Sequence, residues 1–81
     1  MVKKQLELIF PTNMIKEPVI YLMARAVPVV FNIRRAEVTP TIGEIVLELE
    51  ADSDKILNDA IEFLNRKGIQ TQPVSGSAVE S

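Results

Sequence analysis

The centre of the chain carries the feature that most restricts its fold, a pair of strand-like stretches joined by a short turn. Residues 29–39 are rich in β-branched side chains, and turn-forming residues follow from Pro40 to Gly43. From Glu44 to Ala51 apolar and polar residues alternate, which places one row of side chains on each face of a strand. These features predict a β-hairpin in the middle of the chain.

The same alternation predicts how the two strands of the hairpin pair. With the turn centred on residues 41–42, Val38 lies opposite Ile45, and the apolar rows of both strands face the same side. In this register Arg34 lies opposite Leu49, on the side of the sheet that we expect the helices to cover.

Apolar spacing on either side of the hairpin predicts the remaining elements. Asp52 or Ser53 can cap a second helix, and Gly68 ends it. The predicted strands are residues 5–10, 29–39, 44–51 and 69–74, and the predicted helices are residues 18–27 and 54–67. The order strand, helix, strand, strand, helix, strand predicts an α+β, ferredoxin-like βαββαβ fold, a four-stranded antiparallel sheet with two helices on one face.

This fold leaves the other face of the sheet uncovered. We expect Ile9, Val46 and Ile33 to lie there among charged residues, a mixed surface that a second copy of the chain would partly cover. The sequence therefore predicts a homodimer. Residues 1–75 are expected to form one domain, and residues 76–81 a flexible C-terminal tail.

The absence of cysteine and histidine restricts the chemistry of the chain. These residues supply the ligands of zinc fingers and iron–sulfur clusters, the thiol nucleophile, and the base of the Ser-His-Asp triad. Glu44, Glu48 and Glu50 have no histidine partners and are interpreted as a solvated face rather than a metal site. We expect neither an enzyme nor a metal or cofactor.

Charge and hydropathy exclude two further classes of partner. Nine basic against eleven acidic residues give a net charge of −2, and three Phe and one Tyr provide no platform for stacking bases, so no nucleic-acid partner is expected. The longest apolar stretch, residues 18–31, contains Arg25 and Pro28 and is too short for a membrane span. These observations predict a cytoplasmic domain with no membrane insertion.

Two segments of the hairpin resemble a known family. Residues 31–38 read Phe-Asn-Ile-Arg-Arg-Ala-Glu-Val and residues 42–49 read Ile-Gly-Glu-Ile-Val-Leu-Glu-Leu. Together they resemble the NIL domain, a branch of the ACT-like fold named after an Asn-Ile-Leu triplet that enters its second strand. Asn32 and Ile33 match the first two residues of the triplet, and Arg34 stands in place of the leucine. The resemblance extends from about residue 3 to residue 74.

NIL domains are best known as C-terminal regulatory modules of the ATPase subunits of methionine importers, where they dimerise and bind methionine. Because this sequence has no P-loop, the resemblance implies a stand-alone regulatory domain. It implies a ligand that is methionine or a related sulfur-containing amino acid, bound at a subunit boundary. The ligand-binding positions implied are Asn32 and Ile33, with Arg34 as a third.

Each of these residues also has an interpretation without a ligand. Asn32 can satisfy backbone groups where its strand begins, and Arg34 can form an ion pair with a glutamate instead of binding a ligand carboxylate. In the alternative function, the domain binds no ligand and docks through its sheet to a protein partner in sulfur amino acid metabolism or transport.

Overall fold

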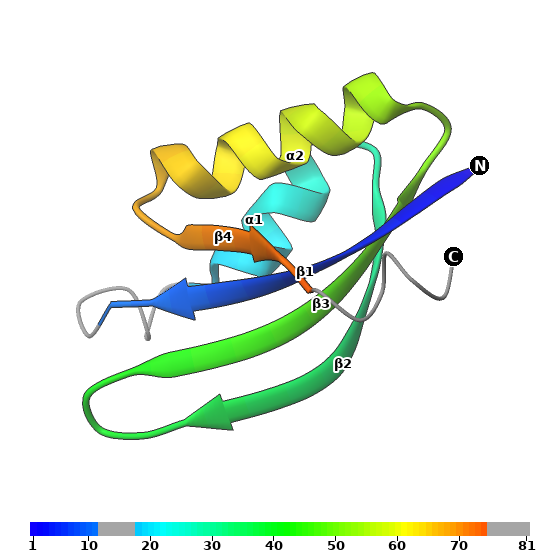
Figure 1. The fold of residues 1–81 in the computed structure, drawn as a ribbon. Helices are drawn as coiled ribbons and strands as arrows, with labels where there is room; N and C mark the ends of the chain where they lie inside the picture. Colours follow the sequence, from blue (N-terminus) through cyan, green and yellow to red (C-terminus); the bar gives the residue numbers. More distant parts are fainter. Residues whose placement is uncertain (12–17, 75–81) are drawn as a thin grey trace.

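A computed structural model of the protein describes residues 1–11 and 18–74. Its elements are β1 (Val2–Phe10), α1 (Val19–Ala26), β2 (Val30–Val38), β3 (Gly43–Ala51), α2 (Asp54–Arg66) and β4 (Gln70–Pro73) (Figure 1). This order confirms the predicted one. The predicted C-terminal tail, residues 76–81, lies outside the described residues.

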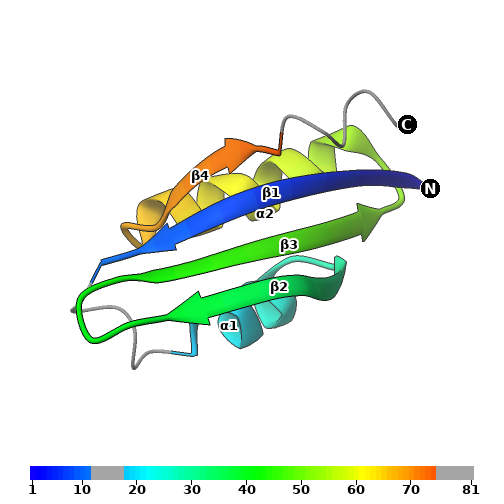
Figure 2. The same cartoon turned by 60° about the horizontal axis from the view of Figure 1, so that its bottom comes forward.

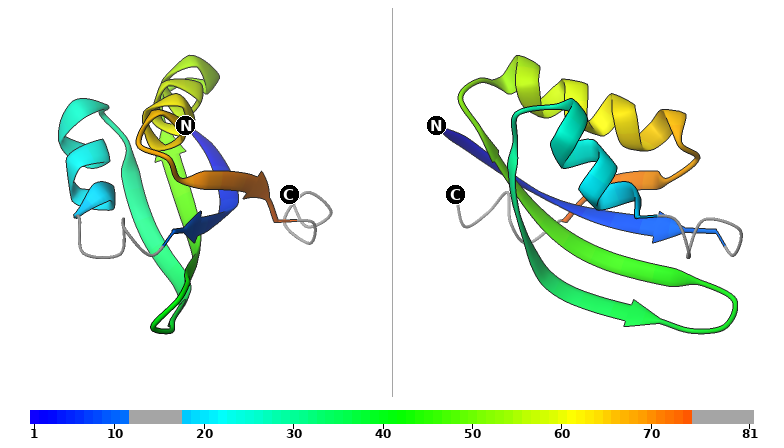
Figure 3. Two further views of the ribbon diagram at one scale, coloured as in Figure 1. Left: turned by 90° about the vertical axis from the view of Figure 1, so that its left-hand side faces the viewer. Right: turned by 180° about the vertical axis from the view of Figure 1, so that it is seen from behind.

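The four strands form one antiparallel sheet in the order β2-β3-β1-β4. Both helices lie on the same face of this sheet, and Figure 2 shows the strands in front with the helices behind them. The hairpin end of β2 and β3 extends beyond the helices (Figure 3). The predicted ferredoxin-like fold is therefore confirmed, and no element of residues 1–11 and 18–74 covers the other face of the sheet.

The core lies between the helices and the sheet, and every buried residue in the described chain is apolar. Alternate residues of β1 and β3 point inward, and one stripe of each helix packs on them. The buried residues include Leu6, Leu8 and Phe10 of β1, Leu47, Leu49 and Ala51 of β3, Val19 and Met23 of α1, and Leu57, Ala60 and Leu64 of α2. Each fully buried leucine stabilises the fold by roughly 1.5–3 kcal/mol through removal of apolar surface from water.

Both ends of α2 are closed by local hydrogen bonds. The Ser53 hydroxyl accepts a hydrogen bond of 3.3 Å from the Ile56 N–H, so Ser53 and not Asp52 is the N-cap. At the other end Gly68 has a φ of 90°, and the Ile69 N–H donates to the Leu64 carbonyl at 3.0 Å. This bond and that positive φ form a Schellman motif, which favours glycine because it has no Cβ.

The pairing of β2 with β3 differs from the predicted register. The Thr39 N–H donates to the Ile42 carbonyl at 2.8 Å, and the Thr39 hydroxyl accepts from the Ile42 N–H at 3.1 Å. These bonds centre the turn on residues 40–41, where the fixed φ of Pro40 suits the second position of a turn. Val38 therefore lies opposite Gly43, and the predicted pairing with Ile45 is wrong.

An irregularity in β2 changes the faces of its first residues. The register shifts between Ile33 and Arg35, so Arg34 occupies a β-bulge and the predicted pairing of Arg34 with Leu49 is wrong. Ile33 lies opposite Leu47, whose side chain is buried under the helices. Ile33 therefore lies on the helix side of the sheet. The prediction from uninterrupted alternation, which placed Ile33 on the uncovered face, is wrong.

Candidate functional site

The three sequence-predicted ligand residues lie together on β2, in the outer row of the sheet. Asn32 is opposite Glu48 on the uncovered face, Ile33 is on the helix side with 48% of its surface exposed, and Arg34 is in the bulge. The three residues are consecutive on one strand, but the structure places Asn32 and Ile33 on opposite faces of the sheet. None of the three lines the pocket described next, and their role in binding stays a prediction.

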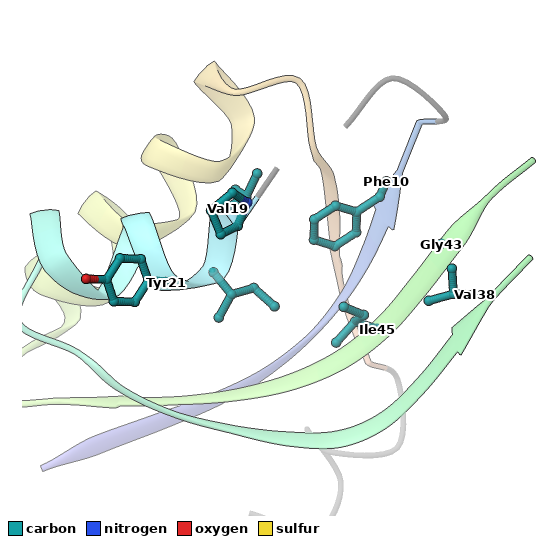
Figure 4. A pocket seen from close by; sticks show the side chains of 8 residues that line it. Phe10, Val19, Tyr21, Val38, Gly43 and Ile45 are labelled. Carbon is teal, nitrogen blue, oxygen red and sulfur yellow. The ribbon is translucent and has the colours of Figure 1, made fainter. Parts of the chain in front are cut away.

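A pocket of about 170 Å³ lies between the start of α1 and the hairpin end of the sheet. Figure 4 shows Phe10 between α1 and the hairpin, with Ile45 and Val38 beneath it. The lining residues are Phe10, Pro18, Val19, Ile20, Tyr21, Val38, Gly43 and Ile45. Among the described residues, all of the side chains that line it are apolar or aromatic.

One position of the sheet that borders the pocket has no side chain. Gly43 lies between Phe10 of β1 and Val38 of β2, in register with both. Any larger residue at this position would project toward the helix side, as Leu47 does farther along the same strand. Gly43 has no positive φ, so the backbone itself does not require glycine there.

The lining suits a small apolar group with a polarisable atom. A cavity of about 150 Å³ is large enough to hold benzene, so this pocket fits a side chain and not a nucleotide. Phe10 and Tyr21 present aromatic rings, with which a thioether sulfur makes favourable contacts. The Tyr21 hydroxyl is directed to Arg25, whose guanidinium donates to it at 3.4 Å.

The start of α1 adds a positive potential beside the pocket. Pro18 is the N-cap and provides no side-chain hydrogen bond, and the first turn of α1 contains no acidic residue. The backbone N–H groups and the dipole of a helix N-terminus favour negative charge. A ligand that has an apolar side chain and a carboxylate matches both features of this corner of the fold.

The uncovered face of the sheet is acidic. Its charged residues, assigned from the strand registers, are Glu7, Glu37, Glu44, Glu48 and Glu50 against Lys3 and Arg35. The Gln5 amide donates to Glu48 at 3.3 Å, and the Gln72 amide donates to Glu7. Such a face repels a second copy of itself, since like charges would be brought together.

The structure shows no group of three acidic residues placed to hold a metal ion within residues 1–11 and 18–74. In the same part of the chain, neither helix has the length and hydropathy of a membrane span.

Comparison with known proteins identifies the family. The model of the NIL domain family matches residues 4–73 of the sequence. The chain belongs to the NIL domain family. A search of curated proteins found no match to the sequence.

Among solved structures, this NIL domain is similar to the crystal structure of the C-terminal domain of an ABC transporter ATP-binding protein from Enterococcus faecalis. The two share 20% sequence identity with a TM-score of 0.75, and the match covers 88% of this chain and 82% of the other. At this level of identity the similarity confirms the fold.

Sequence reasoning missed the pocket of the NIL domain. The pocket depends on Gly43 lying level with Phe10 and Val38, which follows from the registers of two strand pairs. The available signal was a glycine at the start of an otherwise alternating strand, since glycine within a strand often marks a close approach.

Proposed function

We propose that this NIL domain is a regulatory domain that binds methionine or a related sulfur-containing amino acid. The observation that carries the proposal is the apolar pocket beside the start of α1, whose volume and aromatic lining match a thioether side chain. The fold shared with the C-terminal domain of an ABC transporter ATP-binding protein supports a role in transport regulation.

In this proposal each part of the ligand has its own partner. The thioether chain enters the pocket between Phe10, Tyr21 and Ile45. The carboxylate lies at the N-terminal end of α1, where the helix dipole favours it. The pocket is formed within one chain, so binding there requires no residue of a second copy.

The remaining parts of the proposal come from the sequence. Asn32, Ile33 and Arg34 form a second contact region on β2, which a homodimer would place at a subunit boundary. The domain binds without catalysis and acts in the cytoplasm. The exposed apolar side chains of β2, including Val30 and Phe31, favour protein docking as the alternative function.

Calorimetric titration tests the proposal, with methionine, homocysteine, cysteine and norleucine as ligands. We expect heat with methionine and none with cysteine, whose side chain does not fill the pocket. The variant Gly43→Val places a branched side chain between Phe10 and Val38 and should abolish the heat. Asn32→Ala leaves the pocket intact and reports on the β2 region separately.

Each result has a defined meaning. Loss of binding in Gly43→Val alone places the ligand in the pocket, and loss in Asn32→Ala alone places it on β2. No heat with any ligand at millimolar concentration would refute the amino-acid sensor and leave the docking function. A thermal-shift assay checks this, because ligand at about 100 times its dissociation constant stabilises a fold by about 2.7 kcal/mol.

A further inference from the structure

A hollow of about 370 Å³ lies on the uncovered face of the sheet, on the opposite side from the apolar pocket beside α1. Its lining residues are Glu7, Arg35, Val46, Gln72, Pro73 and Val74. The two sites have no lining residue in common. Because a cavity of about 150 Å³ holds benzene, this hollow is large enough for a ligand of that size.

Four of the lining residues form one row across the whole sheet. Val46 of β3 lies opposite Arg35 of β2 on one side and opposite Glu7 of β1 on the other. Gln72 of β4 completes the row opposite Glu7. The row therefore presents a guanidinium, an apolar floor and a carboxylate, in that order.

The two charges of the row do not neutralise each other. Neighbouring strands lie about 4.7–4.9 Å apart, so the backbones that carry Arg35 and Glu7 are about 9.5 Å apart. The Gln72 amide donates to the Glu7 carboxylate and holds it toward β4, away from Arg35. Among the described residues all of the ion pairs lie on α2, so neither Arg35 nor Glu7 belongs to one.

We propose that this hollow binds a small zwitterion, with its carboxylate on Arg35 and its ammonium group on Glu7. A guanidinium binds a carboxylate through two parallel N–H donors, and hydrogen bonds between charged groups are the strong ones. The methylene chain of the ligand lies over Val46. This is a second site, on the other face of the sheet from the methionine pocket, and it goes beyond the function proposed above.

The surrounding charges favour a ligand that carries both signs. Glu37 and Glu44 lie opposite each other on this face, on one side of Arg35, and Glu48 lies on the other side. These carboxylates repel a simple anion that approaches Arg35, and Arg35 repels a simple amine. A zwitterion has no net charge, and each of its groups finds the opposite charge in the row.

The width of the row predicts how far apart the ligand charges lie. Charge-assisted contacts of about 2.8 Å at both ends of a span of about 9.5 Å leave about 4 Å between the charged atoms of the ligand. A β-amino acid in its extended form has this spacing, because it has one more carbon between its charges than an α-amino acid. We therefore expect β-alanine to bind better than glycine, which is too short, and better than ε-aminocaproate, which is too long.

Titration of isotope-labelled protein, followed by the NMR shifts of its backbone amides, tests the site. We expect β-alanine to shift the amides of Arg35, Val46 and Glu7 to saturation, with a dissociation constant in the millimolar range because the hollow is open. Propionate and propylamine each lack one charge and should bind about fivefold more weakly or worse. Equal affinity for propionate and β-alanine would overturn the zwitterion, and ε-aminocaproate as tight as β-alanine would overturn the spacing. No saturable shift in the row with any of these compounds would overturn the site itself.

Two variants test the charged residues one at a time. Arg35→Gln and Glu7→Gln should each raise the dissociation constant of β-alanine about tenfold. The matched control Arg66→Gln, on α2, changes the net charge away from the sheet and should bind as the parent does. The amide spectrum of each variant shows in the same experiment that its fold is kept. Unchanged affinity in both Arg35→Gln and Glu7→Gln would refute their role.

These outcomes are separable from those of the methionine proposal. Gly43→Val fills the pocket on the helix side and should leave the binding of β-alanine unchanged. Methionine in that pocket should shift the amides of Phe10 and Gly43, which are outside the row. If β-alanine does not bind, only the second site is lost. If methionine gives no heat while β-alanine still binds, only the methionine sensor is refuted.

Discussion

Glu37 lies directly opposite Glu44 in the β2–β3 ladder, so two carboxylates face each other on the uncovered side of the sheet. Cross-strand pairs of opposite charge contribute roughly 0.2–1 kcal/mol, and like charges destabilise. We therefore expect Glu44→Lys to raise the free energy of unfolding by about 1 kcal/mol, measured in urea at low salt. Glu44→Gln should give a smaller gain. A Glu44→Lys protein no more stable than the parent would contradict the pairing.

The cap of α2 gives a second prediction. Ser53→Ala removes the hydroxyl that accepts from the Ile56 N–H and should lower the free energy of unfolding by about 1 kcal/mol. Asp52 precedes the cap and provides the control, because Asp52→Ala should change stability by no more than about 0.5 kcal/mol. A larger loss in Asp52→Ala than in Ser53→Ala would show that the helix is capped differently in solution.

The other end of α2 predicts a graded response. At Gly68, whose φ is 90°, alanine should cost about 1–2 kcal/mol in unfolding free energy because its Cβ is strained there. Gly68→Asn should cost less, since asparagine tolerates positive φ better. Thermal denaturation of the two variants side by side checks this order of stability. If the variants lost stability only through missing contacts, Gly68→Asn would not be more stable than Gly68→Ala.

The pocket predicts opposite effects on stability and binding at one residue. Gly43→Ala should stabilise the fold by about 0.5–1 kcal/mol, because glycine in a strand costs more backbone entropy than alanine. The added methyl group reduces the pocket, so methionine affinity should fall while the fold is strengthened. Parallel urea and calorimetric titrations measure both. Unchanged affinity in a stabilised protein would place the ligand elsewhere.

The ligand carboxylate predicts a dependence on ligand charge. Methioninol has the same thioether chain as methionine but no carboxylate, so it loses the interaction with the start of α1. We expect methioninol to bind more weakly than methionine, and norleucine, which keeps the carboxylate, to bind better than methioninol. Competition titrations at low salt give the order. Equal affinity for methionine and methioninol would exclude α1 from recognition.

The order of elements and the inward faces could be predicted from sequence because they depend on local spacing. Leu6 and Leu8 alternate within β1, and Leu57 and Leu64 repeat at helical spacing within α2. The buried side of each element can therefore be recognised from that element's own sequence.

The register between β2 and β3, in contrast, could not be predicted from local spacing. Moving Val38 from opposite Ile45 to opposite Gly43 is a shift of two residues, which leaves the side chains between the turn and the bulge on their predicted faces. Apolar rows therefore cannot distinguish the two registers. The turn does so, since the Thr39 hydroxyl and the ring of Pro40 favour a turn one residue earlier than the prediction.

The candidate sites depended on these non-local pairings. The bulge at Arg34 left no mark on the alternation, yet it moved Ile33 to the other face of the sheet. The pocket arises only when β1, β2 and β3 are in their final registers. Binding by Asn32, Ile33 and Arg34 stays a prediction that the titrations above address.

The two edges of the sheet are unequal, and this difference limits how many chains can join edge to edge. Edge-to-edge pairing can spread into fibres when a subunit offers a receptive edge on both sides. Here β4 ends at Pro73 and offers little to a further strand. Among the described strands β2 is the receptive edge, because all nine of its residues are exposed, so pairing of copies through strand edges alone would end at two chains. The short β4 strand, which adds little to the sheet, thus disfavours aggregation by edge-to-edge pairing.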